Sequence, residues 1–349
     1  MKEVDYIIVG LGIAGLSICE VLQAQGKSFV VYDTSQYSST LVAAGVIHPM
    51  VLKRFTPVWK AHEHIHIAIP FYHRLAQKLE TNIIEEIPLL RIFNSVEEQN
   101  NWIVASDKHE LSSFLSSEIH TNHNEHIVSS FGLGKVNISA KVDTTMLLSA
   151  YAEYLQKDGL LFSEVFDYSL LKETEQGVNY NSISARKIIF SEGASIIANP
   201  FFQKDLLIPI KGEYIIIEAL ELKMIEILKG TTFMIPLGND RYKVGATLDR
   251  IDVSRGITEE ARVKLILDVS KMIRCPFKVV DQVAGIRPTT KDRRPLLGCL
   301  PESDKKIFFN GLGARGIMAA PSFAMRLFDF FEGNQALDKE INLLRFLKS

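Results

Sequence analysis

The stretch Tyr6-Ile7-Ile8-Val9-Gly10-Leu11-Gly12-Ile13-Ala14-Gly15 decides the expected fold, because an apolar run leads directly into a glycine-rich turn and then into helical sequence. The glycines fit the pattern G-x-G-x-x-G, in which each has its own steric role. Gly10 allows a tight turn, Gly12 lets the backbone approach a pyrophosphate, and Gly15 lets the helix pack on the strand. The stretch therefore predicts a phosphate-binding loop between a strand and a helix.

The residues that follow complete a β-α-β unit. A helix is expected over residues 14–25, closed by Gly26, and a second apolar strand over 28–32. Free N–H groups and the helix dipole at the start of this helix favour a diphosphate there. Asp33 ends the second strand, where a carboxylate accepts hydrogen bonds from ribose hydroxyls. These features predict a bound dinucleotide but do not choose between NAD and FAD.

Further along the chain, the apolar pattern alternates between helix and strand. Helices are expected over 62–80, 144–157 and 258–272 and from about Ile317, and strands over 187–191, 212–218, 233–246 and 306–310. Residues 100–140 are polar and their periodicity is broken. The strand at 187–191 is expected in the parallel sheet of the first unit, whereas a turn at 238–240 folds 233–246 into a hairpin of an antiparallel sheet. The pattern predicts an α/β protein, α+β overall.

Composition argues against several classes of function. The 349 residues carry a formal net charge of -2 and no block rich in Lys or Arg, so a nucleic acid is not expected as a partner. No apolar stretch reaches the length of a transmembrane helix, and the first residues leave no room for a secretion signal, so we expect a cytoplasmic protein. The cysteines, expected as reduced thiols, are Cys19, Cys275 and Cys299. The sequence specifies no oligomeric state.

Two histidine series could suggest a metal site: His62, His64 and His66, and His120, His123 and His126. On a helix only His62 and His66 share a face, and no cysteine or carboxylate cluster accompanies them. No metal is therefore expected.

Later segments resemble the D-amino-acid oxidase and glycine oxidase family of FAD enzymes over nearly the whole chain. The most specific segment is Ala-Gly-Ile-Arg-Pro-Thr-Thr-Lys-Asp-Arg-Arg-Pro-Leu-Leu-Gly at 284–298, followed by Asn-Gly-Leu-Gly-Ala-Arg-Gly-Ile at 310–317. Other similar segments are Ser-Ser-Thr-Leu-Val-Ala-Ala-Gly-Val at 38–46, Val-Asp-Thr at 142–144, and the strands at 208–214 and 243–247. The resemblance implies FAD as the cofactor.

The resemblance also implies a Rossmann-type FAD-binding domain with a parallel sheet, interleaved with a substrate domain built on an antiparallel sheet. We expect the FAD-binding domain to comprise residues 1–80, 140–210 and 280–349, and the substrate domain to comprise 81–139 and 211–279. Cys299 is the thiol that we would consider for a link to the flavin. The residues expected to bind FAD are Gly10, Gly12, Ile13, Ala14, Gly15, Asp33, Thr34, Ser39, Thr40, Ala43, Ala44, Gly45, Phe166, Glu192, Gly193, Gly285, Arg287, Gly313, Ala314, Arg315, Gly316 and Ile317.

Catalytic roles are expected for Arg287, Arg315 and His48. Arg287 resembles the family arginine that clamps a substrate carboxylate through two parallel hydrogen bonds. The alternative role for this residue is a structural ion pair behind the flavin. Arg315 lies in a glycine turn at a helix start, where N–H groups can stabilise the reduced flavin. Glycine oxidases take a second substrate contact from this turn, but the matching residue here is Ala314. His48 could approach the flavin or substrate, or be structural.

The expected reaction is oxidation of the C–N bond of an amino acid or related amine by hydride transfer to flavin N5, with oxygen or a quinone as the electron acceptor. One alternative is a flavoprotein acting on a carboxymethylamino-modified tRNA base, because residues 45–49 and 313–321 also resemble the FAD domain of a bifunctional tRNA wobble-uridine enzyme. The other alternative is a non-catalytic protein that binds FAD.

Overall fold

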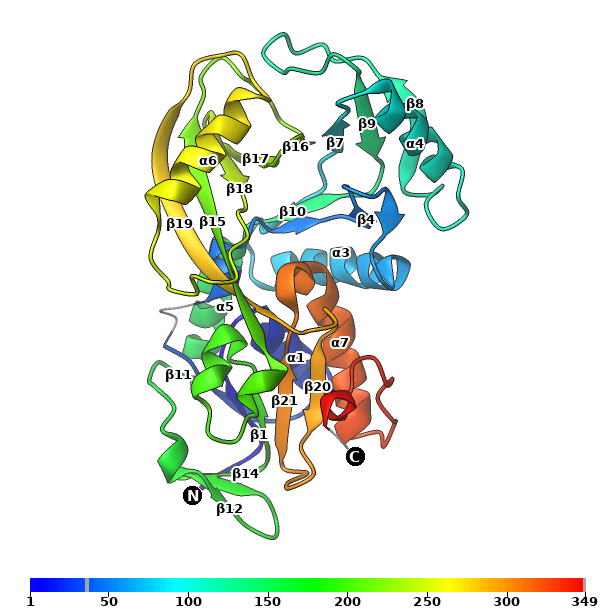
Figure 1. The fold of residues 1–349 in the computed structure, drawn as a ribbon. Helices are drawn as coiled ribbons and strands as arrows, with labels where there is room; N and C mark the ends of the chain where they lie inside the picture. Colours follow the sequence, from blue (N-terminus) through cyan, green and yellow to red (C-terminus); the bar gives the residue numbers. More distant parts are fainter. Residues whose placement is uncertain (35–37, 348–349) are drawn as a thin grey trace.

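The computed structural model describes residues 1–34 and 38–347, which form an elongated molecule with one large sheet in each half (Figure 1). The first sheet has the order β11-β2-β1-β14-β13-β12, with β21 added beside β14 and β20 beside β21. Its strands are β1 (Lys2–Val9), β2 (Phe29–Tyr32), β11 (Leu161–Phe162), β12 (Lys172–Glu173), β13 (Val178–Tyr180), β14 (Ile183–Phe190), β20 (Leu296–Cys299) and β21 (Lys306–Asn310). Strands β11, β2, β1, β14 and β21 run parallel.

The second sheet has the order β19-β15-β18-β17-β16-β7-β9-β8 and is antiparallel except between β16 and β7. Its strands are β7 (Leu89–Ile92), β8 (Leu115–His120), β9 (Leu133–Val136), β15 (Ile208–Glu218), β16 (Ile227–Lys229), β17 (Phe233–Gly238), β18 (Arg241–Gly245) and β19 (Lys278–Thr289). Together, the two sheets confirm the mixed α/β fold that the sequence predicted.

Helices cover both sheets. The helices are α1 (Ile13–Ala24), α2 (Ser39–Val42), α3 (Ala61–Lys78), α4 (Val96–Ser106), α5 (Thr144–Lys157), α6 (Glu259–Ser270) and α7 (Gly316–Phe331). Small sheets join β3 (Val46–Ile47), β10 (Ala140–Val142) and β6 (Ile84–Glu85), and β4 (Met50–Val51) and β5 (Thr56–Pro57). Short 3-10 turns occupy Tyr168–Leu170, Gly193–Ala198, Lys204–Leu206, Gly313–Arg315 and Leu343–Phe346. No helix of the described residues is long and apolar enough to cross a membrane.

The segment expected to be polar and broken, 100–140, contains the end of α4 and the strands β8 and β9. Helix α4 begins at an N-cap, in which the Ser95 hydroxyl accepts from the Glu98 N–H. Its Trp102 side chain is fully buried and donates to the Ser116 carbonyl. The polar and aperiodic sequence of this segment thus forms regular elements that its pattern did not predict.

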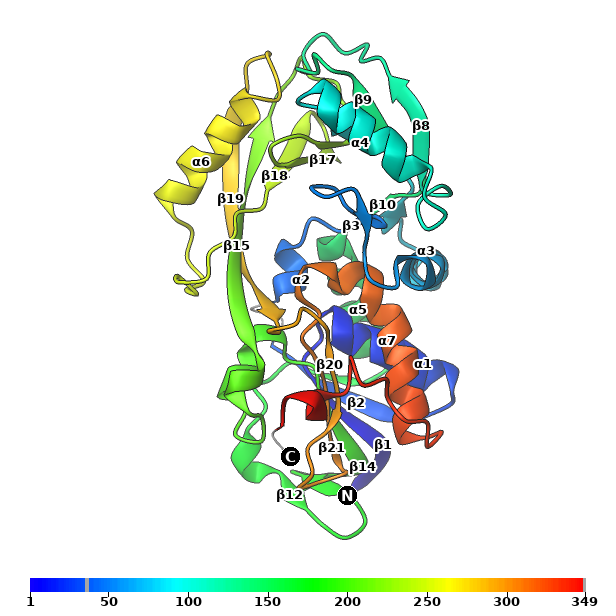
Figure 2. The same cartoon turned by 45° about the vertical axis from the view of Figure 1, so that its right-hand side comes forward.

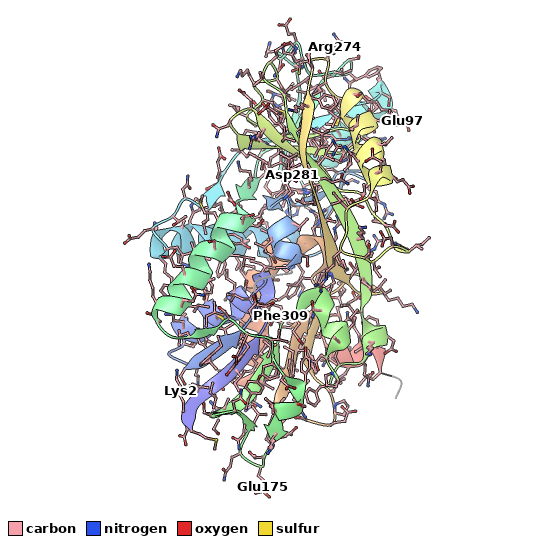
Figure 3. The ribbon with its side chains drawn as sticks, turned by 90° about the vertical axis from the view of Figure 1, so that its left-hand side faces the viewer. Lys2, Glu97, Glu175, Arg274, Asp281 and Phe309 are labelled. Atoms are coloured by element: carbon pink, nitrogen blue, oxygen red, sulfur yellow. The ribbon has the colours of Figure 1, made fainter. Side chains whose placement is uncertain are left out.

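Strands β15 and β19 connect the two halves of the molecule. They pair along their whole length and run from the second sheet towards the first (Figure 2). Both cross the positions at which the sequence predicted domain boundaries, 210/211 and 279/280, and the division into domains stays a prediction. The middle of the molecule is marked by Phe309 of β21, whereas Lys2 and Glu175 lie at one end and Arg274 at the other (Figure 3).

Candidate functional site

A cavity of about 1550 Å³ lies where the two sheets meet, and Phe309 forms part of its wall. It is larger than the cavities of about 300–1,000 Å³ that hold drug-sized ligands, so it has room for a dinucleotide together with a substrate. The carboxyl ends of β1, β2, β14 and β21 contribute from the first sheet, and β15, β17, β18 and β19 from the second. This is the edge at which open α/β sheets bind ligands.

The glycine loop has the backbone geometry that its pattern predicts. Gly10 has a φ of +96°, and a Cβ there would lie 2.6 Å from the Ser191 carbonyl oxygen. At Gly15 a Cβ would lie 1.9 Å from the Gly10 carbonyl oxygen, because α1 packs directly on the loop. At Gly12 the nearest protein atom would be the Ser38 Oγ, at 3.4 Å. Protein packing thus requires Gly10 and Gly15, whereas a Cβ at Gly12 would make only ordinary contacts with Ser38 and Thr40 at the start of α1.

Every residue predicted to bind cofactor or substrate lines this cavity, with the exception of Gly15. The missing side chain of Gly15 makes room for the Gly10 carbonyl instead, as expected for a glycine that lets the helix pack on the strand. Asp33 accepts from the Leu11 N–H at 3.0 Å, and the Thr40 hydroxyl accepts from the Ile13 N–H at 3.0 Å. These two hydrogen bonds connect the end of β2 and helix α2 to the glycine loop at the start of α1.

Acidic and aromatic side chains form the end of the cavity near Glu192. The Glu192 carboxylate accepts hydrogen bonds from the Tyr168 hydroxyl and from the Asn199 amide. Burial raises the pKa of the Glu192 carboxyl to about 6, against the lowering effect of these two hydrogen bonds. The Phe166 ring stacks on Tyr180 with ring centroids 4.1 Å apart, so the ring is part of the packed wall.

Arg287 also lines the cavity, on the surface of the second sheet. Its guanidinium rests on Gly212, where a Cβ would lie 2.1 Å from the Nη2 atom. The Nη1 atom is 3.3 Å from the Thr247 carbonyl oxygen and 3.4 Å from that of Lys211. Among the described residues no carboxylate oxygen lies within 4.0 Å of Arg287. The alternative of a structural ion pair therefore has no acidic partner here.

Arg315 and His48 contact each other directly. Arg315 donates to the His48 Nε2 at 2.9 Å and to the Met50 carbonyl at 3.0 Å. Burial lowers the pKa of Arg315 to about 10, and burial together with the Arg315 charge holds the pKa of His48 well below its usual value. Because a guanidinium only donates, the Nε2 of His48 is unprotonated and the neutral ring carries its proton on Nδ1. His48 is thus a partner of Arg315, and its Nε2 is not free to act as a base.

The pattern of the sequence did not reveal Lys229, which also lines the cavity. Its ammonium donates to the Gly230 and Thr231 carbonyls and lies 5.1 Å from the centre of the Phe233 ring. Burial lowers the pKa of Lys229 to about 8. Phe233 in turn lies 5.6 Å from the His48 ring. No local motif marks Lys229, because its role depends on strands that meet only in the folded chain.

A buried ion network lies beneath Arg287. The Lys211 ammonium lies 2.5 Å from Asp252 and 3.4 Å from Glu213. Glu213 also accepts from the Thr258 N–H and hydroxyl. The network holds the segment after β18 against β15, and this segment supplies the Thr247 carbonyl near Arg287.

Cys299 and the histidine series lie apart from this site. Cys299, the thiol considered for a link to the flavin, pairs with Ile307 in the first sheet and does not line the cavity. The rings of His62 and His66 have centroids 4.1 Å apart on α3. The described part of the chain has no group of three or more His, Cys, Asp or Glu side chains that could hold a metal ion.

The glycine loop at the carboxyl end of a parallel sheet, opening into a cavity of dinucleotide size, defines a Rossmann-type nucleotide-binding protein. The family described as FAD dependent oxidoreductase (DAO) matches residues 5–329, and the chain belongs to it. It is 23% identical to a glycine oxidase of Bacillus licheniformis over 95% of this chain and 94% of that protein. These findings confirm that the chain is an FAD-dependent enzyme of the amine and amino-acid oxidase class.

Solved structures show the same fold. The glycine oxidase from Geobacillus kaustophilus superposes with a TM-score of 0.79, at 18% identity and with complete coverage of both chains. The iminodiacetate oxidase from Chelativorans sp. BNC1 superposes with a TM-score of 0.77, at 18% identity, and covers 96% of this chain and 97% of its own.

The residues around the cavity fit FAD. Gly12 leaves open the space that a pyrophosphate needs at the start of α1, and Asp33 lies beside it for a ribose. The turn at Gly313–Arg315 and the start of α7 line the cavity near Arg315, where N–H groups can face the pyrimidine end of a flavin.

Proposed function

We propose that this enzyme oxidises the C–N bond of a small amine that carries a carboxylate, as in an amino acid or an N-alkyl amino acid. The observation that supports this most directly is Arg287, a cavity-lining guanidinium without an acidic partner among the described residues. A guanidinium in such a position can bind a carboxylate through two parallel charge-assisted hydrogen bonds.

Bound FAD supplies the hydride acceptor at N5. The electron pair of the C–H bond next to nitrogen leaves as a hydride, the nitrogen lone pair forms the C=N bond, and oxygen or a quinone takes the electrons in a second half-reaction. Arg287 would hold the carboxylate and so fix the reacting carbon relative to the flavin. The carbonyls of Lys211 and Thr247 keep this guanidinium on Gly212.

The amine would enter unprotonated, because His48 is not free to act as its base. The Nε2 of His48 is already bonded to Arg315, and burial keeps the ring neutral. The α7 N-terminus and the Arg315 charge would stabilise the negative charge of the reduced flavin.

The test is Arg287→Lys, measured as flavin bleaching by amines under anaerobic conditions. Lysine keeps the charge but cannot form the bidentate contact, so the rate constant for flavin reduction over Kd should fall about 10- to 150-fold for amines with a carboxylate. FAD content should stay the same. The matched control is Arg326→Lys, at an exposed ion pair with Glu63 on the far side of α7, which should leave the kinetics unchanged.

An amine that lacks a carboxylate serves as the second control, since it does not use this contact. Its slow reaction should be nearly the same in the wild type and in Arg287→Lys. Equal losses for acidic and non-acidic amines would show that Arg287 supports the flavin, and the proposed substrate class would be wrong.

A further inference from the structure

Acidic and basic side chains both line the cavity. The acidic residues are Asp33, Glu164 and Glu192. Arg287, Arg315 and Lys229 also line it and have no carboxylate oxygen within 4.0 Å among the described residues. We call these three side chains the basic compartment, because they lack counter-ions from the described part of the chain.

Two of these cations belong to one continuous group, which we call the His48 cluster: Lys229, Phe233, His48 and Arg315. The Lys229 ammonium lies 5.1 Å from the Phe233 ring centre, and the Phe233 and His48 rings are 5.6 Å apart. Arg315 then bonds to His48 at 2.9 Å. All four side chains line the cavity.

Arg287 lies across the sheet from this cluster. Its guanidinium rests on Gly212 of β15, two residues from Tyr214. Tyr214 pairs with Gly245 of β18, and Gly245 pairs with Phe233 of β17. Two strand spacings of about 4.8 Å therefore separate β15 from β17, or about 10 Å along the sheet.

The negative charges of FAD alone do not neutralise the cations of the basic compartment. Its two phosphates would lie at the start of α1, beside Gly12, and the reduced flavin carries one negative charge. The carboxylate in the proposed function neutralises Arg287. The reduced flavin would pair with Arg315, so Lys229 of the His48 cluster still lacks a counter-ion, and a partly buried charge without a partner is unfavourable.

We propose that the substrate carries a second carboxylate, which Lys229 of the His48 cluster binds while Arg287 binds the first. This rests on the proposed function and names its substrate class: small dicarboxylic amines, such as an amino acid with an acidic side chain or an amine with two carboxymethyl groups.

The first experiment measures binding without turnover. Succinate and butyrate have similar length but differ by one carboxylate, and neither has an amine to oxidise. Each is titrated into the FAD-bound enzyme and followed by the change in the flavin spectrum. Succinate should bind about 10- to 100-fold more tightly, the effect of one added charge-assisted contact. Equal affinities would overturn the inference, whether or not any amine is oxidised.

The second experiment measures flavin reduction with two matched pairs, iminodiacetate against sarcosine and D-aspartate against D-alanine. We expect the dicarboxylic member of at least one pair to have a rate constant over Kd about 10- to 100-fold higher. If monocarboxylic amines reduce the flavin equally well, the inference is wrong and the proposed function stands. If no amine with a carboxylate reduces the flavin while succinate still binds tightly, the proposed reaction is wrong. The inference that the basic compartment binds two carboxylates then still stands.

Variants assign the preference to the His48 cluster. Lys229→Met should reduce the ratio of succinate to butyrate affinity towards one. The control Lys223→Met removes an exposed lysine that pairs with Asp240 outside the cavity and should keep the wild-type ratio. Arg315→Met should weaken the sulfite adduct of the flavin. If Arg315→Met abolishes the ratio while Lys229→Met keeps it, the proposed role of Lys229 is wrong.

Discussion

Gly12→Ala separates what the fold needs from what the cofactor needs. The backbone at Gly12 has φ -75° and ψ -170°, which any residue can adopt. An added Cβ would lie 3.4 Å from the Ser38 Oγ and 3.5 Å from the Thr40 Oγ1, which are ordinary contacts. The apoprotein should therefore change in stability by less than about 1 kcal/mol.

The same methyl group would occupy the space at the start of α1 where the pyrophosphate of FAD approaches. Forcing an extra methyl into a close contact costs about 1–3 kcal/mol, so the affinity for FAD should fall about 5- to 150-fold. The assay is titration of apoprotein with FAD, followed by flavin fluorescence, alongside urea unfolding of the apoprotein.

Gly15→Ala is the contrasting variant in the same loop. Its Cβ would lie 1.9 Å from the Gly10 carbonyl oxygen, so α1 must move away from β1, and the apoprotein itself should be destabilised. The reasoning would be refuted if Gly12→Ala bound FAD as tightly as the wild type. It would also be refuted if the two variants lost equal stability without FAD.

Two further predictions concern charged groups that burial affects. The pKa of Glu192 is raised from 4.5 to about 6 in the folded protein, so the folded state binds more protons than the unfolded state between these values. Stability of the apoprotein should fall by about 2 kcal/mol as the pH rises through this window, and Glu192→Gln should remove this slope in urea unfolding measured from about pH 4 to pH 8. Lys211→Met should destabilise the protein by about 3 kcal/mol in the same assay, because it leaves the buried Glu213 without its cation. The exposed pair of Lys223 offers the control, since Lys223→Met should change stability by less than about 1 kcal/mol; equal effects would contradict a structural role for Lys211.

The elements predicted best from the sequence are those with strong local signals. The helix expected over 144–157 has the bounds of α5, and the Asp143 side chain caps it by accepting from the Met146 N–H. Strand β21 also has its expected bounds, since four of its five residues are buried. Local capping and continuous apolar runs determine such elements almost independently of the rest of the chain.

The second sheet was harder to predict near its edge. Strand β8 contains Ser116, Ser117 and Glu118 in its middle, and it pairs only with β9 in the described chain. An edge strand with one solvated face needs few apolar residues, so its sequence resembles a loop. The N-cap residue Ser95, which accepts from the Glu98 N–H, was the available signal for α4.

The residues of the site also fall into two groups: those whose roles follow from local sequence, and those that only the fold brings together. The roles of Gly10, Gly12 and Gly15 follow from a local pattern, because a strand, a turn and a helix constrain one another over a few residues. The contact of Arg315 with His48 joins residues 267 positions apart, and no spacing rule predicts it.

Gly212 shows why the substrate end of the cavity needs the folded structure. Its backbone is ordinary strand, yet a Cβ there would lie 2.1–2.4 Å from three atoms of the Arg287 guanidinium. The absence of a side chain at Gly212 is what lets Arg287 lie flat on β15, within reach of the Lys211 and Thr247 carbonyls. The arginine can be predicted to bind a carboxylate from its sequence segment, but its position depends on a glycine from a different strand. Specificity at this end of the cavity therefore arises from the pairing of β15, β18 and β19, and a substitution in any of these strands can move Arg287 without touching it.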